Sequence, residues 1–361
     1  MFALRRLALV ASASLIAISC TASSDRTPGG SGGKNGAGSG GVSGGSGGSG
    51  GSATGSGGSA AGSGGSTAMG TGGASSGSGG TITPADGGGS GGATMSDAGP
   101  MEDAGRAPAN PSAGCGMPAD QALATYVTKN IMTGGMARSY RLYLPDGYDP
   151  MKAYPTIILA HGCGGNGGLP FPIETASKNE AIVAALKSVG TCFDQGPNGI
   201  DVPYFDAVLA EISAKHCVDK ARVFMGGFSS GSWLTYTIGC VRAGVVRGTG
   251  NASGNQVGGL PTCKGPIAAL IAHDVNDDQN SFAGGMMARD RILKTNGCST
   301  QTLPYDWDGD PTTPSPCVIY QGCMPGYPVV WCPTMAPPGQ PTHNNQVPIT
   351  TVGLWRFWKQ F

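Results

Sequence analysis

The stretch from Arg222 to Thr237 combines a nucleophile with the local structure that would expose it. It reads RVFMGGFSSGSWLTYT: a short apolar run, then a G-x-S-x-G sequence over 227–231, then residues that can continue as a helix. A strand, a sharp turn and a helix in this order hold a serine in strained backbone dihedrals, and the flanking glycines let neighbouring backbone approach closely. We therefore predict Ser229 as a nucleophile. The N–H of Ser230, at the start of the helix, is predicted to donate to a developing oxyanion.

A second turn predicts the other oxyanion donor. The apolar run Tyr154–Leu159 is typical of a buried strand, and it leads into the sequence HGCGG over 161–165. In α/β-hydrolases, an HGGG-type loop after an early strand contributes an N–H to the oxyanion hole, and the backbone N–H of Cys163 takes that place here. His161 is interpreted as a turn residue that holds this loop by a hydrogen bond, because it precedes the serine in the chain.

Chain order restricts the base and the acid. In this type of fold both follow the nucleophile, the acid first and the histidine second, and only His273 and His343 come after Ser229. His273 ends an apolar run and stands directly before an acidic loop over 274–278. If the acid lies on that loop, the base must come later, which selects His343. The remaining histidine, His216, is interpreted as a residue before a strand.

The same elements predict the fold class. Apolar strand-like runs over 154–159, 223–225, 268–272 and 329–331 alternate with helix-compatible segments, and a helix is expected over 351–360. These elements are within the range of an α/β domain. If the strands pair in parallel, their carboxyl ends meet at one edge of the sheet, and the three predicted catalytic loops lie close together there.

Residues 1–20 predict export. Arg5 and Arg6 precede an apolar stretch that is too short to span a bilayer, as in a signal peptide. The stretch ends in Ala-Ile-Ser-Cys, which resembles the lipobox of bacterial lipoproteins and predicts a lipid on Cys20. Cleavage by an ordinary signal peptidase is the alternative. The protein is expected to be secreted, or held at the outer surface of a bacterial cell by a lipid, with no other membrane contact.

Residues 21–110 predict a flexible tether. They hold 33 of the 65 glycines, and no aromatic residue occurs between Phe2 and Tyr126. Such a Gly/Ser-rich segment cannot bury a core and behaves as a flexible coil. The catalytic domain is therefore predicted to comprise residues 111–361.

The cysteine content and the net charge limit which cofactors and binding partners the protein is expected to have. The ten cysteines after Cys20 are an even number, which in an exported chain predicts up to five disulfides, including local ones among Cys298, Cys317, Cys323 and Cys332. With no C-x-x-C pair and four histidines, no metal site is expected, and no cofactor is implied. The formal net charge of zero gives no electrostatic drive toward nucleic acid.

From Ser139 to Phe361 the chain resembles secreted esterases related to polyhydroxybutyrate depolymerase and to feruloyl esterases. The similar stretches are YRLYLP (140–145), HGCGG (161–165), CVDKARV (217–223) and GFSSG (227–231). The resemblance implies an α/β-hydrolase fold, with a mostly parallel central sheet and helices on both faces. It also implies the acid at Asp277 and an aromatic at Phe282, from the family's His-Gly-x-x-Asp loop. Asp274 stands where the family has glycine, so Asp274 or Asp278 are alternative acids. The family's Trp-Pro is missing after His343, and the Cys-rich tail looks more like the feruloyl esterase branch.

Together these features predict a serine carboxylic-ester hydrolase that acts through an acyl-enzyme on ferulate-type esters of plant cell-wall polysaccharide. Polyhydroxybutyrate depolymerase and acetyl xylan esterase are the alternative substrate assignments. A surface-tethered binding protein without catalysis and a peptidase are alternatives of other classes. Trp233, Phe282 and Trp331 are expected to line the acyl pocket, with a place in the core as the alternative for each.

Overall fold

The computed structural model describes residues 107–255 and 262–361. The predicted signal peptide, the predicted lipidation site Cys20 and residues 21–106 of the predicted tether lie outside the described residues. Near the predicted start of the catalytic domain, the backbone N–H of Asn110 donates to Oδ1 of Asp219 at 2.8 Å, so the chain is already in contact with the sheet there.

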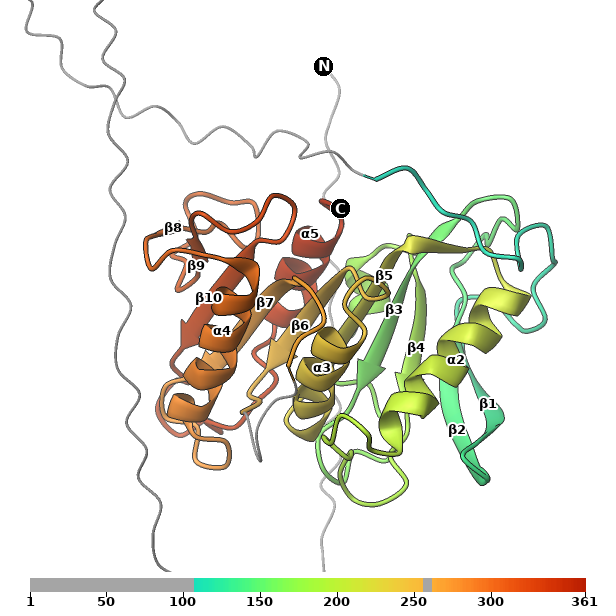
Figure 1. Cartoon of the computed structure of the whole chain (residues 1–361), viewed down its shortest axis with the longest axis horizontal. Helices are drawn as coiled ribbons and strands as arrows, with labels where there is room; N and C mark the ends of the chain where they lie inside the picture. The colour runs from blue at the N-terminus through green and yellow to red at the C-terminus, as the bar shows by residue number, and fades with distance from the viewer. Residues whose placement is uncertain (1–106, 256–261) are drawn as a thin grey trace, which may run out of the picture. The chain divides into compact units, whose positions relative to one another are not determined.

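One sheet of ten strands organises the described part of the chain (Figure 1). Its order is β1-β2-β4-β3-β5-β6-β7-β10-β9-β8. The six strands from β4 to β10 in that order pair in parallel, and β1, β2, β9 and β8 join the two edges by antiparallel pairing. The strands are β1 (Tyr126–Thr133), β2 (Met136–Tyr143), β3 (Tyr154–Ala160), β4 (Ile182–Leu186), β5 (Val218–Phe228), β6 (Gly248–Ala252), β7 (Ala268–Asp274), β8 (Thr302–Pro304), β9 (Val318–Tyr320) and β10 (Val329–Thr334).

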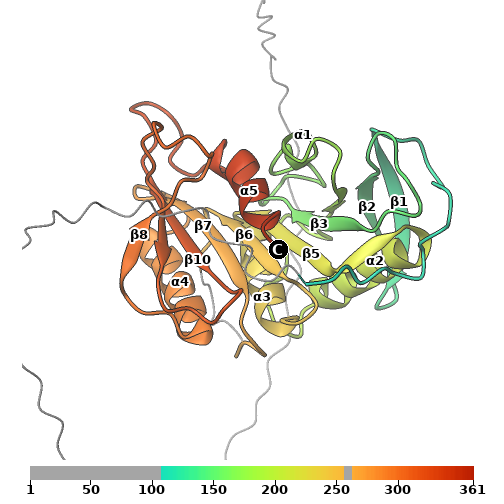
Figure 2. The ribbon, with the colours of Figure 1, turned by 90° about the horizontal axis from the view of Figure 1, so that it is seen from above.

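Helices cover both faces of the sheet, as Figure 2 shows from above. On one face lie α2 (Asp201–Lys215), α3 (Ser230–Val241) and α4 (Phe282–Asn296). On the other lie α1 (Ile173–Ala176) and α5 (Leu354–Trp358), the latter preceded by a π-helical turn over Ile349–Gly353. The expected mostly parallel sheet with helices on both faces is confirmed.

Each face of the sheet has its own core because side chains alternate along a strand. In β3, Ile158 packs into the cluster under α2, α3 and α4, and its neighbours Ile157 and Leu159 pack into the cluster with α1 and α5. All three side chains are fully buried. A strand buried on both sides reads as a continuous apolar run, which is why YPTIIL was recognisable in the sequence.

The last helical segment differs from the predicted helix over 351–360. Helical structure begins at Ile349 with the π-helical turn, and the α-helix ends at Trp358. The hydroxyls of Thr350 and Thr351 donate to the backbone carbonyls of Asn345 and Pro348, respectively. Side-chain bonds of this kind compete with regular helical hydrogen bonding, and apolar periodicity does not reveal them.

Five disulfides join the ten cysteines after Cys20, which agrees with the predicted maximum. Two of them are local to the Cys-rich tail, as expected, and Cys163 is bonded to a cysteine on the neighbouring loop. The pairs are Cys115–Cys217, Cys163–Cys192, Cys240–Cys263, Cys298–Cys323 and Cys317–Cys332. Among the described residues, no helix is long and apolar enough to cross a membrane.

A buried ion pair joins the antiparallel edge of the sheet to α2 and yields a stability prediction. Nη2 of Arg138 lies 2.5 Å from Oδ1 of Asp201, and both side chains are 2% exposed. Replacing Arg138 by Met leaves a buried carboxylate without its cation, so we expect the free energy of unfolding to fall by about 3–5 kcal/mol. Arg242→Met breaks the more exposed pair with Asp206 and should cost at most about 1 kcal/mol. Urea unfolding of both variants measures the difference, and equal losses would contradict the argument.

Candidate active site

Ser229 lies on a strained turn directly between β5 and α3. Its φ is +54° and its ψ is −118°, a conformation that residues other than glycine rarely adopt. A Cβ on Gly227 would lie 2.2 Å from the backbone of Gly231, and a Cβ on Gly231 would lie 1.9 Å from the carbonyl oxygen of Ala160. Both flanking positions therefore require glycine, which is the physical reason for the G-x-S-x-G pattern at this turn.

One predicted oxyanion donor directly follows this serine, and the loop that carries the other packs against the turn. The N–H of Ser230 is at the first position of α3, where N–H groups have no acceptor within the helix. The HGCGG loop packs against the turn, because a Cβ on Gly162 would lie 3.2 Å from Cβ of Ser229. Within the described residues the backbone N–H of Cys163 donates to no backbone acceptor, whereas that of the next residue, Gly164, bonds to the carbonyl of Thr191 at 2.7 Å.

His161 holds the HGCGG loop, as the sequence predicted. Its Nδ1 lies 2.6 Å from the carbonyl oxygen of Gly162, and its Nε2 accepts the backbone N–H of Ser188 at 3.3 Å. These partners require a neutral ring protonated on Nδ1. Burial lowers the pKa of this histidine, which favours the neutral form.

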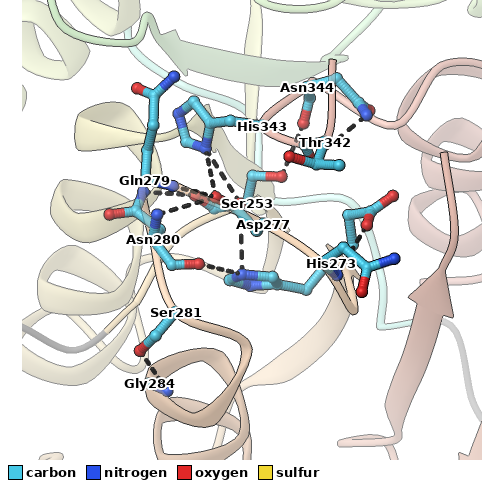
Figure 3. A network of polar contacts seen from close by, with 12 residues as sticks. Ser253, His273, Asp277, Gln279, Asn280, Ser281, Gly284, Thr342, His343 and Asn344 are labelled. Atoms are coloured by element: carbon cyan, nitrogen blue, oxygen red, sulfur yellow. Dashed lines mark hydrogen bonds and ion pairs between the residues drawn. The ribbon is translucent and has the colours of Figure 1, made fainter. Parts of the chain in front are cut away.

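The imidazole of His343 and the carboxylate of Asp277 meet at the carboxyl edge of the sheet (Figure 3). Nδ1 of His343 lies 3.0 Å from both carboxylate oxygens. Asp277 is on the loop after β7, and His343 is on the loop after β10. The imidazole also packs on the ring of Phe228, with 4.9 Å between ring centroids. Since Phe228 directly precedes Ser229, the acid, the histidine and the serine turn are assembled in one place.

The surroundings of Asp277 keep its carboxylate ionised. Burial by itself would raise the pKa, but hydrogen bonds from His343 and from the backbone N–H groups of Asn280 and Gln279 outweigh it. The net effect is a pKa for Asp277 below its usual 3.8. In the neutral imidazole, an ionised acceptor beside Nδ1 places the proton on that nitrogen, so that Nε2 is the nitrogen able to accept one.

The two alternative acids are placed differently. Asp274 is fully buried at the end of β7, and its carboxylate accepts the backbone N–H groups of Asn276 and Ala336 at 2.9 and 2.5 Å. Asp278 is exposed. The carboxylate that contacts His343 is thus the one that the family resemblance implies.

The remaining histidines, His273 and His216, are both fully buried. His273 is fully buried beneath Asp277, with Nε2 2.9 Å from the carbonyl oxygen of Asn280 and 3.4 Å from Oδ2 of Asp277. His216 is fully buried at the end of α2 before β5, where its Nε2 lies 3.5 Å from Asp120. Within residues 107–255 and 262–361, no group of three or more His, Cys, Asp or Glu side chains could hold a metal ion.

The three aromatic residues expected in an acyl pocket divide into two kinds. Trp233 on α3 and Phe282 at the start of α4 are half-buried. Trp331 on β10 is only 4% exposed and packs behind Phe282, with 5.5 Å between ring centroids. Its burial favours the alternative of a core residue for Trp331, since the side chain supports Phe282 from below. The sequence did not distinguish these cases, because all three are aromatic residues next to apolar runs.

Known proteins show the class to which the chain belongs. No protein-family model matches it. Feruloyl esterase D of Neurospora crassa is 31% identical over 281 residues, which cover 71% of this chain and 92% of the relative. Feruloyl esterase C of Emericella nidulans is 33% identical over 170 residues, covering 45% of this chain and 63% of the relative.

Among solved structures, the acetyl xylan esterase of Aspergillus awamori superposes with a TM-score of 0.50 at 15% identity, covering 65% of this chain and all of that one. That likeness shows the fold. Sheet, serine turn and acid–histidine pair define an α/β-hydrolase. The chain belongs to the feruloyl esterase family and is a carboxylic ester hydrolase.

The lowered pKa of Asp277 predicts a pH-dependent contribution to stability. A carboxyl group whose pKa is lower in the folded than in the unfolded chain stabilises the fold above the unfolded pKa, and this contribution is lost as pH falls through the folded one. The difference in free energy of unfolding between the wild type and Asp277→Asn should therefore shrink as pH falls from about 5, where a carboxyl group of the unfolded chain begins to bind protons. Urea unfolding at each pH measures it. The exposed neighbour Asp278 provides the control, because Asp278→Asn makes the same replacement on the same loop. A difference between the wild type and Asp277→Asn that stays constant with pH would contradict the prediction.

Proposed function

We propose that the protein is a secreted serine esterase in which Ser229 is the nucleophile, His343 the general base and Asp277 the acid that orients it. The observation that carries this proposal is the contact of Nδ1 of His343 with both oxygens of Asp277, beside the strained serine turn. Membership of the feruloyl esterase family supports the same assignment. The reaction proceeds through an acyl-enzyme.

Proton transfer follows from the hydrogen bonds of the histidine. With its Nδ1 proton donated to Asp277, the imidazole accepts the proton of the Ser229 hydroxyl on Nε2 as the serine attacks the ester carbonyl. The same proton then passes to the leaving alcohol. In the second half of the reaction His343 deprotonates water, which attacks the acyl carbonyl, and the imidazolium returns this proton to Oγ of Ser229 as the acyl–serine bond breaks and the acid is released. Asp277 stays ionised throughout and stabilises the imidazolium that forms in each half.

The oxyanion of each tetrahedral intermediate is held by two backbone N–H groups, those of Cys163 and Ser230. Both flank the serine turn, and the second also lies at the positive end of the α3 dipole. Their positions are set by packed backbone before substrate arrives, so no reorganisation is needed when charge develops on the carbonyl oxygen. The loop with Cys163 is further held by its disulfide to Cys192.

The acyl group is proposed to be a hydroxycinnamate of the ferulate type, esterified to plant cell-wall polysaccharide. Feruloyl esterase relatives and the half-buried rings of Trp233 and Phe282 support an aromatic acyl group. Acetyl xylan is the second candidate, because an acetyl xylan esterase shares the fold. Polyhydroxybutyrate is the third candidate.

The protein is further proposed to be exported and attached to the outer surface of the cell. Five disulfides fit an oxidising compartment outside the cytosol. The sequence of residues 1–110 supports a bacterial signal peptide, a lipid on Cys20 and a flexible tether. Such a tether would let the catalytic domain reach an insoluble polymer while the chain stays at the cell surface.

Ser229→Ala tests the catalytic assignment. It removes the nucleophile while a side chain of similar size keeps the turn, so we expect hydrolysis of p-nitrophenyl acetate and labelling by a fluorophosphonate probe to fall to background. Far-ultraviolet circular dichroism and the unfolding midpoint should stay close to those of the wild type. Unchanged turnover in a folded Ser229→Ala protein would contradict the proposal. Absence of turnover and labelling in the wild type would favour a non-catalytic binding protein.

A substrate panel separates the candidate acyl groups within the same experiment. Wild-type protein and Ser229→Ala are compared on methyl ferulate, acetylated xylan, polyhydroxybutyrate film and casein. The proposal expects release of ferulate as the fastest Ser229-dependent reaction. Faster release of acetate or hydroxybutyrate would replace the acyl assignment, and hydrolysis of casein would indicate a peptidase.

The disulfide beside the oxyanion loop yields a separate prediction. Replacing both Cys163 and Cys192 by Ser removes the bond yet keeps the backbone N–H of residue 163. Because this N–H acts on charge that develops only in the transition state, looser positioning should lower kcat by about 10-fold and leave KM nearly unchanged. Steady-state kinetics on p-nitrophenyl acetate measures this. The control is Cys298→Ser with Cys323→Ser in the Cys-rich tail, which should keep kcat.

A further inference from the structure

Ser253 occupies an unusual place directly after β6. Its side chain is fully buried, and its φ is +45°, which a serine rarely adopts. Its backbone N–H donates to the carbonyl of Ala272 in β7 at 3.0 Å. The strained residue is therefore hydrogen-bonded to an inner strand of the sheet. Strained backbone of this kind persists only where the surroundings hold it, and it concentrates at functional sites.

The hydroxyl of Ser253 binds the loop that carries the histidine. Its Oγ donates to the carbonyl oxygen of Asn344 at 2.7 Å and accepts Nε2 of Gln346 at 3.3 Å. Asn344 directly follows His343, and Gln346 has a positive φ of 57°. One buried hydroxyl thus bonds to two residues of the segment immediately after the base.

The carbonyl of Ser253 binds the loop that carries the acid. Nδ2 of Asn280 donates to it at 2.6 Å, and the backbone N–H of the same asparagine donates to Oδ1 of Asp277 at 2.8 Å. The carbonyl oxygen of Asn280 in turn accepts Nε2 of His273 at 2.9 Å. Figure 3 shows Ser253 among these groups, with the acid and the histidine in contact beside it.

The third connection goes to the nucleophile. The residue before Ser253, Ala252, accepts the backbone N–H of Ser229 with its carbonyl oxygen at 3.0 Å. The two residues at the end of β6 therefore bond to all three segments that carry the proposed triad.

We propose that Ser253 is a positioning residue, whose hydroxyl sets the place of His343 against Asp277, which is itself fixed from the same backbone through Asn280. The proposal rests on the function proposed above. Ser253 touches no reacting atom, and its effect on the reaction passes through the acid–histidine pair. Without the hydroxyl, the carbonyl of Asn344 and the amide of Gln346 each lose a buried partner, and the histidine loop loses its side-chain bonds to residue 253.

The direct test compares Ser253→Ala and Ser253→Gly with the wild type. Both variants lack the hydroxyl, and glycine also tolerates the positive φ, so at least the second should fold. We expect kcat for p-nitrophenyl acetate to fall about 10- to 100-fold with little change in KM, and fluorophosphonate labelling of Ser229 to slow by a similar factor.

Ser112→Ala is the matched control. Ser112 is also buried, and its hydroxyl donates to the carbonyl oxygen of a distant residue, His216, at 2.8 Å while accepting the N–H of Val218 at 3.0 Å. It lies beside the amino end of β5, whereas the catalytic loops follow the carboxyl ends of the strands. Its replacement should reduce stability and leave kcat unchanged, which separates positioning from a general loss of stability.

A double-mutant cycle with Asp277→Asn then asks whether Ser253 acts through the acid–histidine pair. If it does, Ser253→Ala should have almost no further effect on the residual rate of Asp277→Asn. Equal effects in both backgrounds, wild-type kcat in Ser253→Gly, or a loss expressed only in KM would each overturn the positioning role. A wild-type protein without ester turnover or labelling would instead overturn the proposed function, and the positioning role with it.

Discussion

Parallel strands present all of their carboxyl ends at one edge of the sheet, and the site depends on this constraint. Ser229 follows β5, Asp277 lies on the loop after β7 and His343 lies on the loop after β10. Within this arrangement the hydrogen bond between Asp277 and His343 is the contact that gives the histidine its orientation. A buried carboxylate would be costly without such partners, so the two loops stabilise each other's position.

The strained turn that carries the proposed nucleophile depends on its flanking glycines. The serine turn closes only because Gly227 and Gly231 have no Cβ that would clash with neighbouring backbone. Positive φ angles recur at Ser229, Ser253 and Gln346, all within the loops that bear the site. The free energy needed to hold them comes from two apolar cores on either side of the sheet and from the disulfides at its margins.

Family membership and site geometry address different questions. Similarity over most of the chain establishes an ester hydrolase of the feruloyl esterase family. Of the three aromatic residues expected in an acyl pocket, Trp233 and Phe282 keep exposed surface with which an acyl group could be contacted, whereas Trp331 is buried. The tether predicted over residues 21–110 bears on where the enzyme acts and not on its chemistry.

The sequence by itself determined the strand, turn and helix around Ser229 and the apolar strand that leads into the HGCGG turn, because each depends on neighbours along the chain. The family resemblance implied Asp277 as the acid, and the tertiary structure decided between it and the two alternatives that the residues left open. Only the tertiary structure decided which strands and cysteines pair, that Trp331 is covered, and that Ser253 joins three loops. These features depend on contacts between residues that are far apart in sequence, and local patterns carry no information about such distances.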